Sequence, residues 1–139
     1  MASKQLDHLA QIPLFSACSK RDLQRIARAS NEINVEAGRL LVDQGDAGRE
    51  AFVVMEGKAV VKRNGRKVAE LGPGDAIGEL ALLDHGPRTA SVEAITPMRL
   101  LVLTAREFAG VIDEVPGLCH KLMATLAGRV REFDKQLYG

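Results

Sequence analysis

The sequence predicts a mainly β domain with flanking α-helices, in which about eight strands form two packed sheets. Between residues 33 and 75, short runs rich in β-branched residues are separated at short intervals by glycines. This pattern is typical of a sandwich or barrel. Two more β-rich runs occupy residues 90–95 and 98–104. Before and after this β region, the apolar residues are spaced as in helices.

The length and charge of the chain exclude several classes of protein. At 139 residues it fits one domain, which can bury a core without a metal or a disulfide. The 19 basic residues nearly balance the 18 acidic ones, so no general attraction to nucleic acid or anionic lipid is expected. No apolar run approaches the roughly 20 residues of a membrane-spanning helix. We expect neither nucleic acid nor a membrane as a partner.

Cysteine usage and the first residues of the chain indicate the compartment. Cys18 and Cys119 are far apart in the sequence and form no redox or metal-binding pair. The first eleven residues lack the apolar run of a secretory signal. We therefore expect a cytoplasmic protein with reduced thiols.

The N-terminal part, up to about residue 31, is predicted to be helical. Ser19 and Asp22 have the spacing of a capping box, which predicts a helix from there to about Ser30. A packing role is expected for this helix, because Leu23, Ile26 and Ala27 share one of its faces. A short apolar stretch precedes it and consists of Leu6, Leu9, Ile12, Leu14 and Phe15.

One hairpin in the β region is well defined by its turn residues. Asn64 and Gly65 separate the runs AVVKR and RKVAEL. Both residues tolerate positive φ, so a two-residue type I′ turn is predicted between two strands. Farther along, the runs at residues 90–95 and 98–104 are expected to form a second pair, interrupted at Thr96 and Pro97.

Two helices are predicted after residue 104. Residues 106–115 form a short one, and Pro116, favoured at a first helical position, opens a longer one up to residue 137. This longer helix has a continuous apolar stripe, made of Leu118, Leu122, Leu126, Val130, Phe133 and Leu137. The stripe packs back on the β body, which is the default, or pairs with the same helix of a second chain, or closes over a ligand.

The segment IGELALLDHGPRTASV, residues 77–92, holds the candidate binding residues. Gly78 breaks the strand geometry and is followed by one helical turn, whose unpaired amides are suited to a phosphate. Arg88 follows Pro87 and has a planar fork that can grip two phosphate oxygens. Glu79 is an acceptor suited to ribose hydroxyls. Taken singly, an Arg beside a Pro is more often a solvated turn residue, and a Glu at a helix start is simply favoured by the dipole.

Their joint spacing resembles a known family. Residues Gly78-Glu79-Leu80-Ala81-Leu82 and Pro87-Arg88-Thr89-Ala90-Ser91 are similar to the phosphate-binding cassette of cyclic nucleotide-binding domains. These domains occur in protein kinase A regulatory subunits, cyclic-nucleotide-gated channels and bacterial catabolite activator proteins. Further similar motifs cover nearly the whole chain: Leu14-Phe15, Gly45-Asp46, Met55-Glu56-Gly57 and residues 72–75.

The resemblance implies a single domain, residues 1–139, that holds 3′,5′-cyclic AMP or GMP as its ligand and needs no cofactor. It implies a double-stranded, jelly-roll-like β-roll at about residues 32–104, with the cassette at 77–92, and C-terminal helices at about 105–137. By carry-over, Glu79 binds the ribose 2′-hydroxyl and Arg88 the exocyclic oxygen of the cyclic phosphate. Four more residues complete the site, namely Gly78, Leu80, Ala81 and Thr89.

Three details of the resemblance bear on the ligand and its effect. Ile77 stands where the family usually has phenylalanine, which affects local packing but not the polar contacts. The Thr89 hydroxyl can bond the phosphate or the amino group of a syn guanine, so it permits cGMP while cAMP is the preferred expectation. In the family the C-terminal helices move on binding, and here the candidate lids over the purine are Leu126, Val130, Phe133 and Tyr138.

Enzymatic and DNA-binding functions find no support in the sequence. Gly57-Lys58 is followed by Ala59 and is no phosphate-binding loop of the Walker type. His8, His85 and His120 are far apart, so we expect no metal site and no catalytic residues. After the last predicted helix we expect no DNA-reading helix-turn-helix. The expected function is a sensor module. The alternatives are a structural or dimerisation domain of the same fold that no longer responds to a cyclic nucleotide and, third, an enzyme such as a phosphodiesterase.

Overall fold

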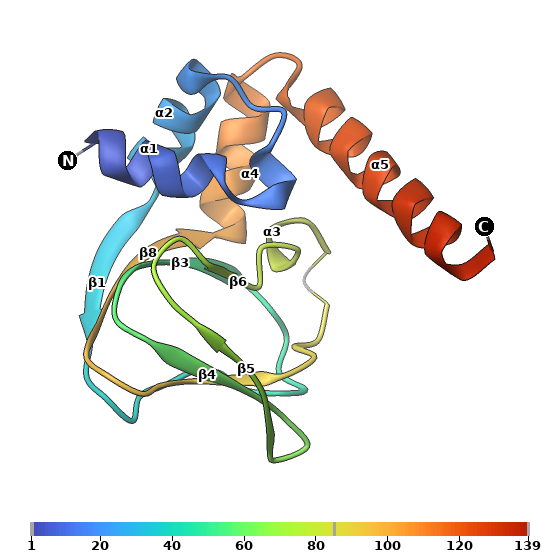
Figure 1. The fold of residues 1–139 in the computed structure, drawn as a ribbon. Helices are drawn as coiled ribbons and strands as arrows, with labels where there is room; N and C mark the ends of the chain where they lie inside the picture. The colour runs from blue at the N-terminus through green and yellow to red at the C-terminus, as the bar shows by residue number, and fades with distance from the viewer. Residues whose placement is uncertain (1, 85, 139) are drawn as a thin grey trace.

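The computed structural model describes residues 2–84 and 86–138. Within them, eight strands form two antiparallel sheets of four, with helices before and after (Figure 1). This confirms the predicted fold class. The strands are β1 (Asn31–Val35), β2 (Leu40–Val42), β3 (Glu50–Glu56), β4 (Ala59–Arg63), β5 (Arg66–Leu71), β6 (Ala76–Ile77), β7 (Ser91–Ala94) and β8 (Met98–Thr104). The helices are α1 (Ala2–Ala10), the 3₁₀ turn η1 (Pro13–Phe15), α2 (Lys20–Ala29), α3 (Ala81–Asp84), α4 (Ala105–Glu114) and α5 (Leu118–Tyr138).

The strand order is β1-β8-β3-β6 in one sheet and β2-β7-β4-β5 in the other. β4 and β5 form the predicted hairpin, and the φ angles of Asn64 and Gly65 are 54° and 79°, as a type I′ turn requires. The expected pairing of the runs on either side of Thr96-Pro97 is wrong. β7 and β8 lie in different sheets, because the connection between them carries the chain from one sheet to the other.

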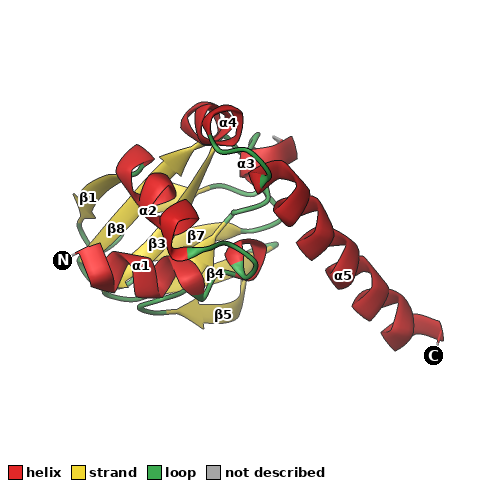
Figure 2. Ribbon diagram, turned by 90° about the horizontal axis from the view of Figure 1, so that it is seen from above, coloured by secondary structure: helices red, strands yellow, loops and turns green. Residues whose placement is uncertain are grey.

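Strand β3 is buried on both of its faces. Ala51, Val53 and Met55 belong to a core shared with the helices, whereas Phe52 and Val54 belong to the core between the two sheets. This follows from the two-residue period of a strand. Figure 2 shows α1, α2 and α4 gathered on one side of the roll, over the sheet that contains β8 and β3.

The N-terminal segment packs as two short helices and one capped helix. The capping box of Ser19 and Asp22 is present at the start of α2, as predicted. The apolar stretch before it contains α1 and η1, and both lie in the part that is predicted to be helical, although the sequence did not give their separate bounds. All five of its apolar side chains are buried in the core beneath the helices, namely Leu6, Leu9, Ile12, Leu14 and Phe15.

Helix α5 begins two residues later than predicted and ends one residue later, at Tyr138. It begins at Leu118 rather than at Pro116, because Gly117 has a φ of 83° and lies outside helical geometry. Its apolar stripe packs on the body only through Leu118, Leu122 and, in part, Leu126. From there α5 leads away from the roll (Figures 1 and 2).

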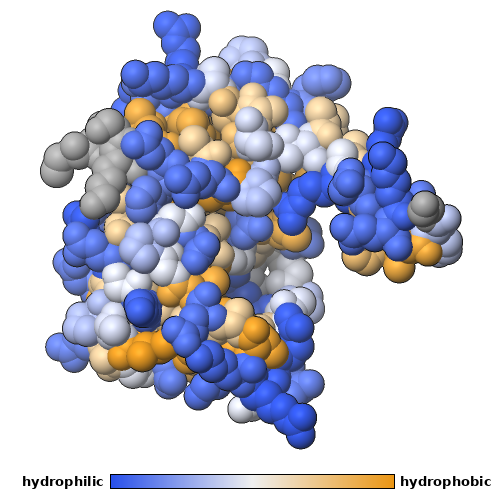
Figure 3. Space-filling model, in the orientation of Figure 1, coloured by the Kyte–Doolittle hydropathy of each residue, from blue (hydrophilic) through white to orange (hydrophobic). Residues whose placement is uncertain are grey.

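The second half of the stripe therefore contradicts the default expectation of packing on the β body. Val130, Phe133 and Leu137 are 68%, 62% and 60% exposed. Figure 3 shows hydrophobic groups along the lower side of this projecting arm, facing open space. None of the described helices is long and apolar enough to cross a membrane.

Candidate functional site

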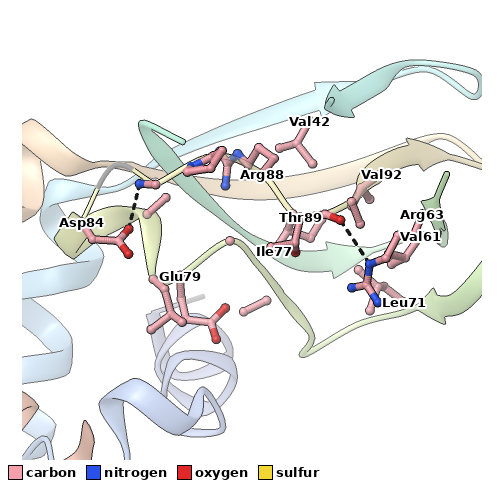
Figure 4. Close-up of a pocket in the computed structure, with 17 residues that line it drawn as sticks. Val42, Val61, Arg63, Leu71, Ile77, Glu79, Asp84, Arg88, Thr89 and Val92 are labelled. Atoms are coloured by element: carbon pink, nitrogen blue, oxygen red, sulfur yellow. Dashed lines mark hydrogen bonds between the residues drawn. The ribbon is translucent and has the colours of Figure 1, made fainter. Parts of the chain in front are cut away.

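A cavity of about 370 Å³ lies between the second sheet and the segment that connects β6 to β7. Its size is within the range of small-molecule sites. Figure 4 shows its lining, which combines an apolar wall with a few polar side chains. The wall includes Val42, Val61, Leu71, Ile77, Ala90 and Val92, and the charged or hydroxyl side chains are Arg63, Glu79, Asp84, Arg88 and Thr89.

Gly78 allows the chain to turn out of β6 towards α3. Its φ is 68°, which is the left-handed region that favours glycine. A Cβ atom at this position would overlap Arg88 Nη1 and lie 3.1 Å from Arg88 Cζ. Gly78 thus serves the site twice, because it makes the turn and leaves room for the guanidinium.

The turn that follows Gly78 differs from the expectation of fully unpaired amides. The N–H groups of Ala81, Leu82 and Leu83 donate to the carbonyl oxygens three residues earlier, at 3.0, 3.2 and 3.0 Å. These are 3₁₀-type bonds, which tighten a short helical turn. The amides of Gly78, Glu79 and Leu80 have no acceptor among the described residues. The available arc of donors is therefore one turn earlier than expected.

Arg88 is held at the cavity wall with one donor left over. Its Nη2 donates to the carbonyl oxygen of Glu50 at 2.7 Å. Its Nη1 is buried and has no hydrogen-bond partner among the described residues. Burial lowers the pKa of Arg88, and the nearby negative charge of Glu50 opposes this effect. The side chain is half-buried, so a cation and an unused donor are both fixed at this wall.

The backbone on either side of Arg88 is fixed by the loop between β2 and β3. The Arg88 amide donates to Asp46 O at 2.7 Å, and Gly45 N donates to Arg88 O at 2.8 Å. Ala47 and Pro87 form an isolated antiparallel bridge, and Gly48 N donates to Gly86 O at 2.9 Å. The cassette segment therefore behaves as an extra strand beside this loop, which explains why residues 40 positions away set the direction of Arg88.

The structure brings all six predicted site residues to this one cavity. Gly78, Glu79, Leu80, Ala81, Arg88 and Thr89 all line it. Glu79 is half-buried, and its carboxylate makes no hydrogen bond to another described residue. Thr89 is exposed at the edge, and its carbonyl accepts from Arg63 Nε at 3.1 Å. Glu79, the partly buried Arg88 and three residues whose amides have no acceptor among the described residues thus line one cavity with a largely apolar wall.

Comparison with known proteins decides the family. Residues 32–115 match the family described as the cyclic nucleotide-binding domain. The chain belongs to this family. It is 38% identical over 130 residues to the cyclic AMP receptor protein of Thermus thermophilus, which covers 90% of this chain and 60% of that protein. The chain therefore spans less than two thirds of this relative.

Solved structures agree with this cyclic nucleotide-binding domain in fold. The N-terminal domain of a transcriptional regulator from Streptomyces coelicolor A3(2) has a TM-score of 0.85 at 33% identity and covers 93% of this chain and 96% of that one. The regulatory domain of Toxoplasma gondii PKA, crystallised with cAMP, has a TM-score of 0.73 at 32% identity. That comparison covers 81% of this chain and 45% of the other.

The candidate lids do not meet the cavity of the cyclic nucleotide-binding domain in this structure. Leu126 packs against the helical core, and Val130, Phe133 and Tyr138 are exposed. None of the four lines the cavity. Their role over a purine stays a prediction, and it requires α5 to move.

Sequence reasoning missed several residues of the cavity. Val61 and Arg63 come from β4 and line it together with Leu71 of β5. The two-residue alternation along β4 places Val61 and Arg63 on one face, but it does not say that this face meets residues 77–92. Asp84 also lines the cavity, where its Oδ1 accepts from Gly86 N at 2.9 Å.

Within residues 2–84 and 86–138, no cluster of three potential metal ligands occurs. His8 Nδ1 lies 3.2 Å from Val54 O, away from the cavity. His85 lies outside the described residues. The groups that line the cavity are suited to an organic anion with hydroxyl groups, because cationic side chains and backbone amides can donate beside the carboxylate of Glu79.

Proposed function

We propose that residues 1–139 act as one sensor domain that binds a 3′,5′-cyclic nucleotide, with cAMP preferred over cGMP. The observation that carries the proposal is that Nη1 of Arg88, at the wall of the cavity, is buried and has no hydrogen-bond partner among residues 2–84 and 86–138. A buried donor without an acceptor costs about 1–3 kcal/mol. An anion that accepts from Nη1 removes this cost, so the site favours a ligand that carries negative charge.

The charge of the site fits a phosphodiester. Arg88 can balance the single negative charge of a cyclic phosphate through its planar donors. The free amides of Gly78, Glu79 and Leu80 lie one turn before α3 and add donors without adding charge. The Ala81 amide is bonded to Gly78 O, so its predicted contact with phosphate requires the turn to open slightly on binding.

Glu79 supplies the acceptor that a ribose needs. Its carboxylate lines the same cavity as Arg88 and makes no hydrogen bond to another described residue. A carboxylate next to a phosphate site accepts well from sugar hydroxyls. We therefore assign the ribose 2′-hydroxyl to Glu79.

The preference for cAMP is supported by the similar proteins. One relative is a cyclic AMP receptor protein, and one similar structure contains cAMP. Thr89 is exposed at the edge of the cavity, where its hydroxyl can accept from the amino group of a guanine. cGMP is therefore the second ligand of the proposal.

Coupling to the C-terminal helices is part of the proposal, and a shared core supports it. Leu82 of α3, Phe108 of α4 and Leu118 of α5 belong to one buried cluster. α3 packs directly on α4. A change in the α3 turn on phosphate binding thus has a packed route to the base of α5.

One observation favours the alternative of a structural or dimerising domain. The second half of α5 exposes Val130, Phe133 and Leu137, and such a surface can serve assembly without any ligand. A binding measurement distinguishes the two functions, because only the sensor domain is expected to bind a cyclic nucleotide. The third alternative, a phosphodiesterase, predicts conversion of cAMP to AMP during incubation.

The test is calorimetric titration of the protein with cAMP, cGMP, 2′-deoxy-cAMP and 5′-AMP. We expect cAMP to bind with about micromolar affinity, or roughly −8 kcal/mol, and more tightly than cGMP. 2′-Deoxy-cAMP should bind more weakly than cAMP, and 5′-AMP should serve as the negative control. In thermal unfolding, cAMP at 100 times its Kd should add about 2.7 kcal/mol of stability. No heat and no thermal shift with either cyclic nucleotide at millimolar concentration would overturn the proposal.

A further inference from the structure

Arg63 is a charged residue of the cavity that the phosphate and ribose contacts do not use. It ends β4, and Val61, two residues earlier, lines the cavity with it. Lys62 between them does not line the cavity, and its Nζ lies 3.7 Å from Glu93 Oε2. Because side chains alternate along β4, Arg63 lies on the face of the strand that lines the cavity, whereas Lys62 lies on the other face.

One hydrogen bond of Arg63 and two of its neighbour Asn64 fix this edge of the cavity. The side chain of Gln44 makes two hydrogen bonds of 2.9 Å with Asn64, one to its amide and one to its side-chain oxygen. Arg63 Nε donates to the Thr89 carbonyl at 3.1 Å (Figure 4). The hairpin of β4 and β5 is thus bonded to the loop between β2 and β3, which holds Arg88, and also to Thr89.

The remaining donors of Arg63 are available to a ligand. Among the described residues its one hydrogen bond uses Nε, and it forms none of the ion pairs. Nη1 and Nη2 of Arg63 are therefore donors without an acceptor in the part of the chain that the structure describes. Because Arg88 already balances a monoanionic phosphodiester, the charge of Arg63 is not needed there.

Arg63 lies beside a part of the apolar wall that suits a purine base. Val61 and Leu71 belong to the apolar wall of the cavity and lie next to Arg63, and a base packs against such a wall. A base lying there presents one of its edges to Arg63. Guanidinium donors fit adjacent acceptors, and guanine has two of these in N7 and O6, whereas adenine has N7 beside a donor amino group.

We infer that Arg63 is a specificity-determining residue that donates to the N7 and O6 atoms of a guanine-type base. This inference rests on the proposed function. Arg63 gives cGMP a contact that cAMP lacks, and so it reduces the ratio by which cAMP binds more tightly than cGMP. Removing it is expected to widen that preference.

The experiment uses three ligands and two matched substitutions in the full chain. cAMP, cGMP and cIMP are titrated by calorimetry against the parent, Arg63→Met and Lys62→Met. cIMP has N7 and O6 but no 2-amino group, so it separates the contact of Arg63 from any contact of Thr89. We expect Arg63→Met to weaken cGMP and cIMP by about tenfold and to leave cAMP within about twofold. Lys62→Met loses the same charge and should change none of the three.

A second variant keeps the test independent of folding problems. Arg63→Lys retains the charge but not the planar fork, and it should also weaken cGMP and cIMP. If Arg63→Met or Arg63→Lys weakens all three ligands equally, or none of them, the inference is wrong while the proposed function stands. If the parent binds none of the three, the proposed function itself fails.

Discussion

Lys121 Nζ donates to Asp22 Oδ2 at 2.6 Å and joins the base of α5 to the first turn of α2. Asp22 is the buried charged residue of the described chain, and its carboxylate also accepts from Ser19 N at 2.9 Å. Leu118 and Leu122, on either side of Lys121, are buried in the helical core. The fixed end of α5 therefore depends on one ion pair and two leucines, while the rest of the helix projects.

Asp22→Asn should lower the free energy of unfolding by about 1–3 kcal/mol. Asparagine keeps an acceptor for the Ser19 amide, so the loss reports mainly the charge pair with Lys121. Denaturant unfolding measures it, and Lys121→Met completes a double-mutant cycle. The matched control is Lys67→Met, which breaks the exposed pair with Glu70 and should cost less than about 1 kcal/mol.

The same pair predicts the direction of the pH dependence. Burial alone would raise the pKa of Asp22, but hydrogen bonds from Lys121 and Ser19 outweigh it and hold the pKa below its ordinary value. The contribution is therefore present above the unfolded value of about 3.9 and is lost as pH falls through the folded pKa. The stability difference between the parent and Asp22→Asn should shrink below about pH 4. A difference that stays constant down to pH 2 would contradict this assignment.

Cys18 should be nearly inert to alkylation at neutral pH. Burial, followed by the negative charge of Asp22, raises the pKa of its thiol to about 11. At pH 8 only about one thousandth of it is thiolate, the reactive form. Iodoacetamide should therefore label the exposed Cys119 long before Cys18, as peptide mass spectrometry would show. Asp22→Asn should increase the rate at which Cys18 is labelled, because it removes a negative charge that raises the pKa of the thiol. Equal labelling rates at both cysteines of the parent would contradict the prediction.

Local signals in the sequence were sufficient for several parts of the fold. The Ser19–Asp22 capping box and the Asn64-Gly65 turn each depend on residues close in the chain, and both are present. Long-range arrangement was not readable in the same way. β7 and β8 are adjacent in sequence but join different sheets, because strand pairing depends on how the whole roll closes. The outward course of α5 was missed for the same reason, because the apolar stripe of a helix does not show which surface packs against it.

The candidate site shows the same division. Residues 77–92 are contiguous, so their turn and chemistry could be predicted together, and all six named residues line one cavity. The pairing of the amides within α3 was not predicted, because the same sequence is compatible with amides that make 3₁₀ hydrogen bonds and with amides that are free. Arg63 was missed because closure of the roll, not its neighbours, brings it beside Thr89.

Gly78→Ala should abolish most cyclic nucleotide binding. A methyl group there overlaps Arg88 Nη1 and would displace the guanidinium. The matched control is Gly65→Ala, whose φ of 79° carries the same backbone strain but where nothing lies within 4 Å of the added carbon. Both variants should lose about 1–2 kcal/mol of stability, and only Gly78→Ala should lose affinity in calorimetry. Equal binding by the two variants would contradict the role of Gly78.

Arg88→Ala should weaken cAMP at least about thirtyfold, because truncating one partner of a desolvated charge pair costs roughly 2–5 kcal/mol. Arg66→Ala is the control, since Arg66 is an exposed hairpin arginine that does not line the cavity. Calorimetry on both variants at one salt concentration gives the comparison. An Arg88→Ala protein within about threefold of the parent would remove this residue from the site.

The exposed half of α5 supplies the last prediction, on the candidate lids. Val130 and Phe133 are 68% and 62% exposed, so replacing both with serine should change the stability of the protein alone by less than about 0.5 kcal/mol. If α5 closes over the bound purine, burial of these side chains strengthens cAMP binding, and the double variant should bind about tenfold more weakly. Met123→Ser, on the exposed and firmly attached part of α5, should leave cAMP affinity unchanged. Sedimentation of the same variants distinguishes the assembly alternative, since loss of a dimer with unchanged cAMP affinity would assign the stripe to a second chain instead of the ligand.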